Sequence, residues 1–384
     1  MTRRVMVVYG TRPEAIKLGP VVRALQADGM DPHVVVTGQH REMLDQVNEL
    51  FAITPETDLS LMSHGASVSA ITRRVLRALE PLLEQVSPEA VVVQGDTTSA
   101  FAASLAGFLA GVPVVHVEAG LRTGDLRMPF PEEANRRLTS VVADLHLAPT
   151  TTARANLERE GIAPGSVVVT GNTVVDALHW AIRQPMPLTD PRVAELGGTR
   201  GLVLVTTHRR ESWGAPMQEA MAGLGDVAAA HPELDFLLPL HRNPVVRDAV
   251  RAVVGGLPNV MLTEPLDYVA FAHLMQRALL VVTDSGGVQE EAPSFGKPVL
   301  VLRESTERPE GVLAGTVRLV GTDRETVSSE VARLLTDPTA YAAMAQAVNP
   351  YGDGQAAARS AAAIRVLLHG GVMPEDFLPR PTVT

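Results

Sequence analysis

Two carboxylates occupy equivalent positions at the ends of two predicted strands. Asp96 follows the apolar run Ala90–Val93, and Glu118 follows the apolar run Val112–Val117. Such runs are typical of buried parallel strands, whose carboxyl ends share the edge of a sheet at which ligands bind. Carboxylates at that edge acquire shifted pKa values and transfer protons. The structural alternative is that Asp96 caps the next helix and Glu118 pairs with Arg122.

A third carboxylate, Glu132, begins a predicted helix after the loop Gly124–Pro131. The loop is long enough to lean over the edge that carries the other two carboxylates. The alternative is that Glu132 with Arg136, and Glu133 with Arg137, form ordinary i,i+4 ion pairs on a helix surface.

Cationic side chains also follow predicted strands. Arg12 and Lys17 come after the strand Arg4–Tyr9, and His208, which two arginines follow, comes after the strand Leu202–Val205. Cations at strand ends are suited to bind a diphosphate, and an imidazole there titrates near neutral pH. The alternative is that Arg12 only solvates the start of a helix and that the histidine is structural.

A Ser-Gly-Gly turn, Ser285–Gly287, connects the predicted strand Leu279–Val282 to a predicted helix. Glycines let backbone N–H groups approach a ligand closely, and the helix dipole favours an anion there. A carboxylate of Glu290 or Glu291 can accept hydrogen bonds from a ribose. The alternative is that Ser285 caps the helix and that the two acids complement its dipole.

These groups require alternating strands and helices to position them, and that alternation runs through the chain twice. The linker predicted at Gln184–Gly198 is rich in Pro and Gly and has no apolar period. We therefore predict an α/β protein of two Rossmann-like domains, 1–183 and 199–350, that face each other across a cleft. The chain could turn after 350, so that the predicted helix 355–369 packs back on the first domain.

The composition and the length of the apolar runs argue against several classes of protein. The chain has 384 residues, a net charge of −10 and no cysteine. The charge argues against a nucleic-acid partner, and the missing thiols exclude disulfides and thiolate metal sites. No apolar run is long enough to span a membrane, and the N-terminus does not resemble a signal peptide, so we expect a cytoplasmic protein. The turn after the first strand is not GxGxxG, so no nicotinamide cofactor is expected.

The motifs, taken in order, resemble the non-hydrolysing UDP-N-acetylglucosamine 2-epimerases of bacteria. The resemblance extends from about Val5 to Gly354. It is carried by Gly10–Lys17, Gln39–Gln46, Gly95–Thr98, His116–Thr123, Pro131–Glu133, His208–Glu211, Thr283–Pro293 and Thr306–Glu310.

The resemblance implies a glycosyltransferase-B-type fold, a homodimer, and interconversion of UDP-N-acetylglucosamine with UDP-N-acetylmannosamine without a cofactor or metal. It implies anti elimination of UDP to a 2-acetamidoglucal, followed by re-addition of UDP. The implied catalytic residues are Asp96, Glu118, Glu132 and His208. For the diphosphate, the implied contacts are Arg12, Lys17 and His208. For phosphate and ribose, they are Ser285, Gly286, Gly287 and Glu291. Phe271 is implied near the uracil, and Arg308 is implied to line the site.

Some members of that family carry a second, regulatory substrate site. Its counterparts in this chain are Gln39, Glu42, Arg74, Glu133, Arg209 and His241. The chain departs from many members at Gln94, where they have histidine. An imidazole there can carry a positive charge, so its replacement bears on the pKa of Asp96. Leu266 stands where other members place a glutamine beside the uracil.

Other functions are compatible with the same residues. A hydrolysing 2-epimerase would release UDP and free N-acetylmannosamine, a glycosyltransferase of the same fold would need an acceptor, and a sugar-nucleotide sensor would bind without catalysis. The sequence leaves open the pathway supplied, regulation by substrate, and which carboxylate is the acid and which the base.

Overall fold

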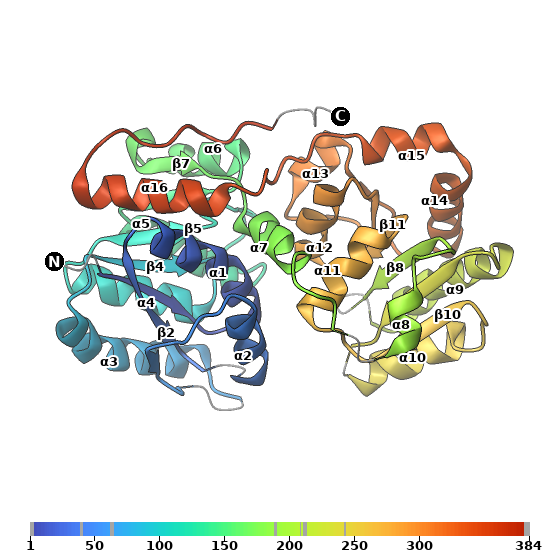
Figure 1. Ribbon diagram of the computed structural model, residues 1–384, viewed down its shortest axis with the longest axis horizontal. Helices are drawn as coiled ribbons and strands as arrows, with labels where there is room; N and C mark the ends of the chain where they lie inside the picture. The colour runs from blue at the N-terminus through green and yellow to red at the C-terminus, as the bar shows by residue number, and fades with distance from the viewer. Residues whose placement is uncertain are drawn as a thin grey trace. The chain divides into compact units, whose positions relative to one another are not determined.

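The computed structural model describes residues 4–38, 41–61, 65–187, 190–207, 209, 213–241 and 243–379, without the side chains of 41–43 and 245. The chain forms two compact units (Figure 1). The N-terminal unit comprises Met1–Ala177 and Tyr351–Leu378, and the C-terminal unit comprises Leu178–Pro350 and the last residues from Pro379.

The N-terminal unit is built on a 7-stranded sheet in the order β3-β2-β1-β4-β5-β6-β7. Every strand pair is parallel. The strands are β1 (Arg4–Tyr9), β2 (Asp31–Val36), β3 (Thr57–Asp58), β4 (Ala90–Gln94), β5 (Val114–Val117), β6 (Leu145–Ala148) and β7 (Val167–Val169). The order reverses between β1 and β4, and ligands of open α/β sheets bind at such a switch point, outside the carboxyl ends of the strands.

Helices cover both faces of this sheet. They are α1 (Arg12–Ala27), α2 (Arg41–Leu50), α3 (Val68–Val86), α4 (Thr98–Leu109), α5 (Glu132–Val142), α6 (Thr151–Arg159), α7 (Thr173–Ala181) and α16 (Ala356–His369). Side chains of α3 and α4 pack with β1, β2 and β4 in one core cluster, and α4 also packs on α5. In Figure 1 the red helix α16 lies against this unit, where it packs on α1.

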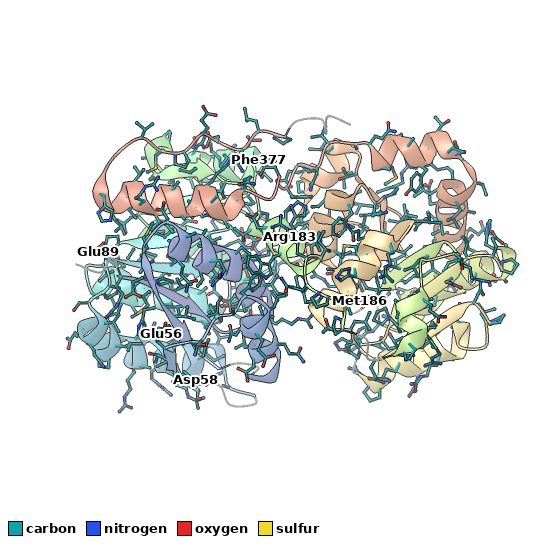
Figure 2. All side chains as sticks on the ribbon, viewed as in Figure 1. Glu56, Asp58, Glu89, Arg183, Met186 and Phe377 are labelled. Atoms are coloured by element: carbon teal, nitrogen blue, oxygen red, sulfur yellow. The ribbon has the colours of Figure 1, made fainter. Side chains whose placement is uncertain are left out.

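The chain after α16 covers the edge strand β7. The Phe377 N–H donates to the carbonyl of Val169 at 2.7 Å, and the Val169 N–H donates to the Asp376 carboxylate at 2.8 Å. Phe377, which Figure 2 labels, lies 5.5 Å from the Arg359 guanidinium of α16. This tail pairs backbone groups that an open sheet edge would expose.

The C-terminal unit repeats the topology with a 6-stranded parallel sheet in the order β10-β9-β8-β11-β12-β13. Its strands are β8 (Leu202–Thr206), β9 (Asp235–Pro239), β10 (Val260–Thr263), β11 (Leu280–Thr283), β12 (Val299–Val301) and β13 (Val317–Leu319). Its helices are α8 (Pro191–Glu195), α9 (Ala215–Ala230), α10 (Pro244–Val254), α11 (Tyr268–Arg277), α12 (Gly286–Glu291), α13 (Pro309–Ala314), α14 (Arg324–Thr336) and α15 (Pro338–Ala345).

Alternate residues of β8 fill two separate cores. Val203 and Val205 face the cluster with α9, α10 and α14, whereas Leu202 and Leu204 face the cluster with α8, α11 and α12. A parallel strand buried on both faces must be apolar at every position, as its sequence is. The prediction of an α/β protein with two Rossmann-like domains is confirmed.

The segment Gln184–Gly198, expected to be a linker, contributes to the C-terminal unit. It contains α8, and Val193 and Leu196 are buried in a core cluster of that unit. The prolines that suggested a linker include Pro191, which stands at the first position of α8, where a missing N–H is tolerated. The short strands β3 and β13 were not predicted.

The N-terminus of α16 is capped from another helix. The carboxylate of Asp176, on α7, accepts hydrogen bonds from the N–H groups of Ala356 at 3.2 Å and Ala357 at 2.9 Å. Burial raises the pKa of Asp176 to about 6, although these two N–H groups oppose the shift. Protonation of Asp176 is therefore favoured by folding.

Because the folded-state pKa lies above the unfolded value, Asp176 stabilises most at low pH and loses that contribution as pH rises through 6. We expect the stability of wild type relative to Asp176→Asn to fall by about 2–3 kcal/mol between pH 4 and pH 7. Thermal melts of both proteins at both pH values measure this change.

Asp323→Asn is the matched control, because Asp323 is an exposed N-cap of α14 whose pKa is lowered. Its contribution is lost only at more acidic pH, so its effect is constant between pH 5 and 7. An equally constant difference for Asp176→Asn over that interval would contradict the prediction.

Candidate functional site

A buried carboxylate joins the two turns that flank the switch point of the N-terminal sheet. Glu14, on α1, accepts hydrogen bonds from Gly10 N at 2.9 Å and Thr11 N at 2.7 Å, after β1. Its other oxygen accepts from Thr97 Oγ1 at 2.6 Å, after β4. Burial raises the pKa of Glu14, and the hydrogen bonds oppose that shift. Glu14 therefore holds the turns after β1 and β4 together.

Glu118, directly after β5, accepts hydrogen bonds from three other segments of the N-terminal unit. Its carboxylate accepts from Asn172 Nδ2 at 2.9 Å, from the Lys17 ammonium and from the Gln94 amide. Its backbone has φ of 62°, in the left-handed region that residues with a side chain rarely adopt. Backbone strain of this kind is concentrated at functional sites.

The turn after β5 requires Gly120. Its φ is 93°, and an added Cβ would lie 2.2 Å from the carbonyl oxygen of Ala153 on α6. No other residue fits this approach, so Gly120 fixes the path of the chain directly after Glu118.

Asp96 is held by the first turns of α5. The Arg136 guanidinium donates to its Oδ2, and Asn135 Nδ2 donates to its carbonyl at 2.9 Å. Burial raises the pKa of Asp96, and the charge of Glu118 adds to the rise, whereas Arg136 and Lys17 oppose it. Asp96 and Glu118 therefore interact electrostatically, and their surroundings differ.

The helix cap and ion pairs considered as alternative roles for the three acids do not form. Thr97, not Asp96, is the N-cap of α4. The Arg122 guanidinium pairs with Glu160 at 2.7 Å and not with Glu118. In place of the alternative i,i+4 pairs on α5, Arg136 forms an ion pair with Glu133 and Arg137 forms one with Glu160.

Two more predicted residues stand at the first positions of helices. Glu132 begins α5 and Arg12 begins α1, and both side chains are half-buried. Neither forms an ion pair or side-chain hydrogen bond within the part of the chain that the structure describes. Both therefore remain available to a ligand.

The second switch point, between β8 and β11, carries the Ser-Gly-Gly turn. Thr206 Oγ1 and Thr283 Oγ1 are 2.6 Å apart across the two strand ends, and Ser285 N donates to Thr283 Oγ1 at 2.9 Å. Asp284 is buried and accepts from Arg209 N at 2.9 Å. Ser285 is at the N-cap of α12 but makes no capping hydrogen bond through its side chain to a described residue.

A cation lies directly over this turn. A Cβ added to Gly286 would be 2.5 Å from a terminal nitrogen of Arg308, so the guanidinium rests on the glycine backbone. Arg308 Nε donates to the buried Glu290 carboxylate at 2.7 Å. The structure thus brings Ser285, Gly286 and Arg308 together and gives Glu290 a role as partner of the arginine.

Glu291 and Phe271 lie on neighbouring helices. Tyr268 Oη on α11 donates to Glu291 Oε1 on α12 at 3.0 Å, and both residues are buried. Phe271, one turn further along α11, packs half-buried against the core, as does Leu266 before the helix. Tyr268 was not identified from the sequence.

The predicted regulatory residues are spread over both units. The described residues do not include Gln39 or the side chain of Glu42. They also do not include His208 of the catalytic set. Arg74 donates to the Leu61 carbonyl at 3.0 Å, and His241 is exposed, with Nδ1 accepting from Asn243 N at 3.2 Å. Glu133 is fully buried, and its carboxylate accepts from the backbone of Thr123 at 3.0 Å. The regulatory site stays a prediction.

Sequence reasoning missed Asn172, Asn135 and Arg136 as partners of the two acids. Asn172 follows the end of β7, so the signal that identified Asp96 applied to it as well. Arg136 was noticed only as a neighbour on its own helix. Arg136 and Asp96 are 40 positions apart in the sequence, so a local sequence pattern does not reveal that they are in contact.

Two parallel α/β units, each with polar side chains at its switch point, define a protein of the glycosyltransferase-B-type fold. A structure of the glycosyltransferase of kitacinnamycin has that fold and aligns over 96% of this chain and 100% of its own, with 15% identity and a TM-score of 0.66.

The chain belongs to the UDP-N-acetylglucosamine 2-epimerase family, whose sequence model matches residues 23–365. It is 50% identical to the UDP-N-acetylglucosamine 2-epimerase of Escherichia coli K12, over 94% of this chain and 98% of the relative. The UDP-GlcNAc 2-epimerase of Neisseria meningitidis, solved with UDP-GlcNAc bound, is 45% identical, with a TM-score of 0.85 over 92% of this chain and 97% of that one.

The described residues contain neither a membrane-spanning helix nor a cluster of metal ligands. None of their helices is long and apolar enough to cross a membrane. Nor do their His, Asp and Glu side chains form a group of three or more that could hold a metal ion.

Proposed function

We propose that this protein interconverts UDP-N-acetylglucosamine and UDP-N-acetylmannosamine without net hydrolysis. A carboxylate removes the C2 proton as UDP leaves by anti elimination, which gives 2-acetamidoglucal. UDP then adds back at C1 while an acid delivers a proton to the opposite face of C2. The observation that carries the proposal is the pair Asp96 and Glu118, coupled at the ends of adjacent strands in a chain half identical to a UDP-N-acetylglucosamine 2-epimerase.

The chemistry explains why both acids and cations are needed. The C2 proton is not adjacent to a carbonyl, so a carboxylate removes it only while the C1–O bond to UDP breaks. Asp96, Glu118 and Glu132 are the acid and base candidates, and each such group contributes on the order of 10²–10⁴ in rate. The raised pKa of Asp96 suits it to carry a proton, and Glu118 is held in place by its donors.

The residues proposed to bind the nucleotide belong mainly to the C-terminal unit. Backbone N–H groups of the Ser285–Gly287 turn and the guanidinium of Arg308 are suited to the phosphates, Glu291 to the ribose and Phe271 to the uracil. Arg12, Lys17 and His208 add positive charge that stabilises the departing diphosphate. Retention of UDP favours re-addition over release, which distinguishes this reaction from hydrolysis.

Incubation with UDP-N-acetylglucosamine in heavy water, followed by proton NMR, tests the function. We expect deuterium at C2 and a mixture of the two UDP-sugars. Free N-acetylmannosamine as the main product would establish a hydrolysing enzyme, and binding of UDP without isotope exchange would establish a sensor.

Substitution of the acids tests their roles. Asp96→Asn, Glu118→Gln and Glu132→Gln should each lower kcat by at least about 100-fold, because each removes a positioned proton-transfer group. Glu158→Gln, on the outer surface of α6, is the control and should keep full turnover. A near-wild-type kcat for any of the three would exclude that residue from proton transfer.

We also propose a homodimer formed through α4 and α5, which pack against each other. Their outer surface exposes Phe108 (55%), Leu109 (70%), Leu138 (49%) and Val141 (76%). Large exposed apolar side chains on two helices that pack together are typical of an interaction site, and a second copy would bury them.

Light scattering tests the dimer. Wild type should have twice the 40.9 kDa mass of one chain, whereas a Leu138→Glu, Val141→Glu double variant should have the mass of one. Leu313→Glu, at an 84% exposed site on α13, is the control. A single-chain mass for wild type would refute the proposal.

A further inference from the structure

One arginine links the Asp96 carboxylate to the interior of the N-terminal unit. Arg136 is 7% exposed, and one of its terminal nitrogens donates to Asp96 Oδ2. The preceding residue, Asn135, holds the Asp96 carbonyl at 2.9 Å. Two consecutive residues of α5 therefore restrain both the backbone and the side chain of Asp96, and Oδ1 is left for other partners.

A second acid lies beside the other terminal nitrogen of the guanidinium. Arg136 Nη1 lies 3.3 Å from the Glu133 carboxylate, which is fully buried. Glu133 also accepts from Thr123 N at 3.0 Å and Gly124 N at 3.4 Å, in the loop after β5. A guanidinium with fixed donors on two sides is suited to lie between two carboxylates, which a lysine ammonium matches poorly.

We propose that Arg136 is a positioning residue for the epimerisation, which orients the Asp96 carboxylate and supplies the positive charge that controls its ionisation. The inference rests on the proposed function, because it gives a role to a residue only through the role of Asp96. Arg136 itself is buried, and its proposed effect is exerted through Asp96.

The charges around Asp96 explain why this partner matters. Glu118 faces it from the end of β5, Lys17 from α1, and Arg136, with Glu133 behind it, from α5. Lys17 is also paired with Glu118, so Arg136 is the main group that counters burial. Without it, Asp96 would hold its proton to higher pH and would be free to rotate.

The test is a double-mutant cycle on kcat for UDP-N-acetylglucosamine, with Arg136→Met and Arg136→Lys made in wild type and in Asp96→Asn. We expect Arg136→Met to lower kcat about 10- to 100-fold, as expected for a misaligned proton-transfer group, with a smaller loss for Arg136→Lys. In the Asp96→Asn background either change should cost less than about threefold, because its target is already gone.

A pH profile separates positioning from a structural role. The limb of the kcat profile that Asp96→Asn abolishes should shift upward by about one pH unit in Arg136→Met, because a neighbouring positive charge is lost. Arg137→Met, which removes the adjacent arginine paired with Glu160, should keep the wild-type profile.

Each outcome has one meaning. If wild type does not epimerise the substrate, the proposed function is wrong. If wild type is active but the losses from Arg136 and Asp96 substitutions multiply, or the profile does not shift, the proposed function stands and the role of Arg136 is refuted. If melting shows that Arg136→Met is unfolded, the Arg136→Lys cycle and its profile decide by the same criteria.

Discussion

The site in the N-terminal unit depends on the buried carboxylate of Glu14. A buried carboxylate without partners costs on the order of several kcal/mol, so the turn after β1 and Thr97 after β4 must both come to it. These two turns flank the switch point, and Glu14 keeps them together there. Lys17, nearly one helical turn along α1, shares the face of Glu14 and carries its ammonium to Glu118.

Asp96 and Glu118 lie at the same edge of the sheet, but their surroundings differ. Glu118 has three donors from separate segments, whereas Asp96 has one guanidinium and a pKa raised by burial. Two carboxylates with different hydrogen-bond partners are suited to different roles in acid–base chemistry. The C-terminal unit uses the same topology for another purpose, because at its switch point a turn of backbone N–H groups and Arg308 present positive charge.

The sequence predicted most of the architecture because each central strand is buried on both faces and is therefore apolar throughout. The strand predicted at Arg4–Tyr9 matches β1, and Asp96 and Glu118 were found because polar residues end such strands. The two-residue strand β3 is too short to show a pattern. What local reading does not reveal is pairing across the chain, and so Arg136 was assigned to its own helix and not to Asp96. Nor does residue type reveal the positive φ of Glu118.

The return of the chain to the N-terminal unit has a consequence for biosynthesis. Residues 351–378 supply α16 and the tail that pairs with β7, yet they are translated after residues 178–350, which form nearly all of the C-terminal unit. On the ribosome, the C-terminal unit can therefore complete its fold before the unit that was translated first. Until then, the nascent N-terminal unit presents an unpaired strand edge and the uncovered surface of α1, the kind of surface that chaperones bind.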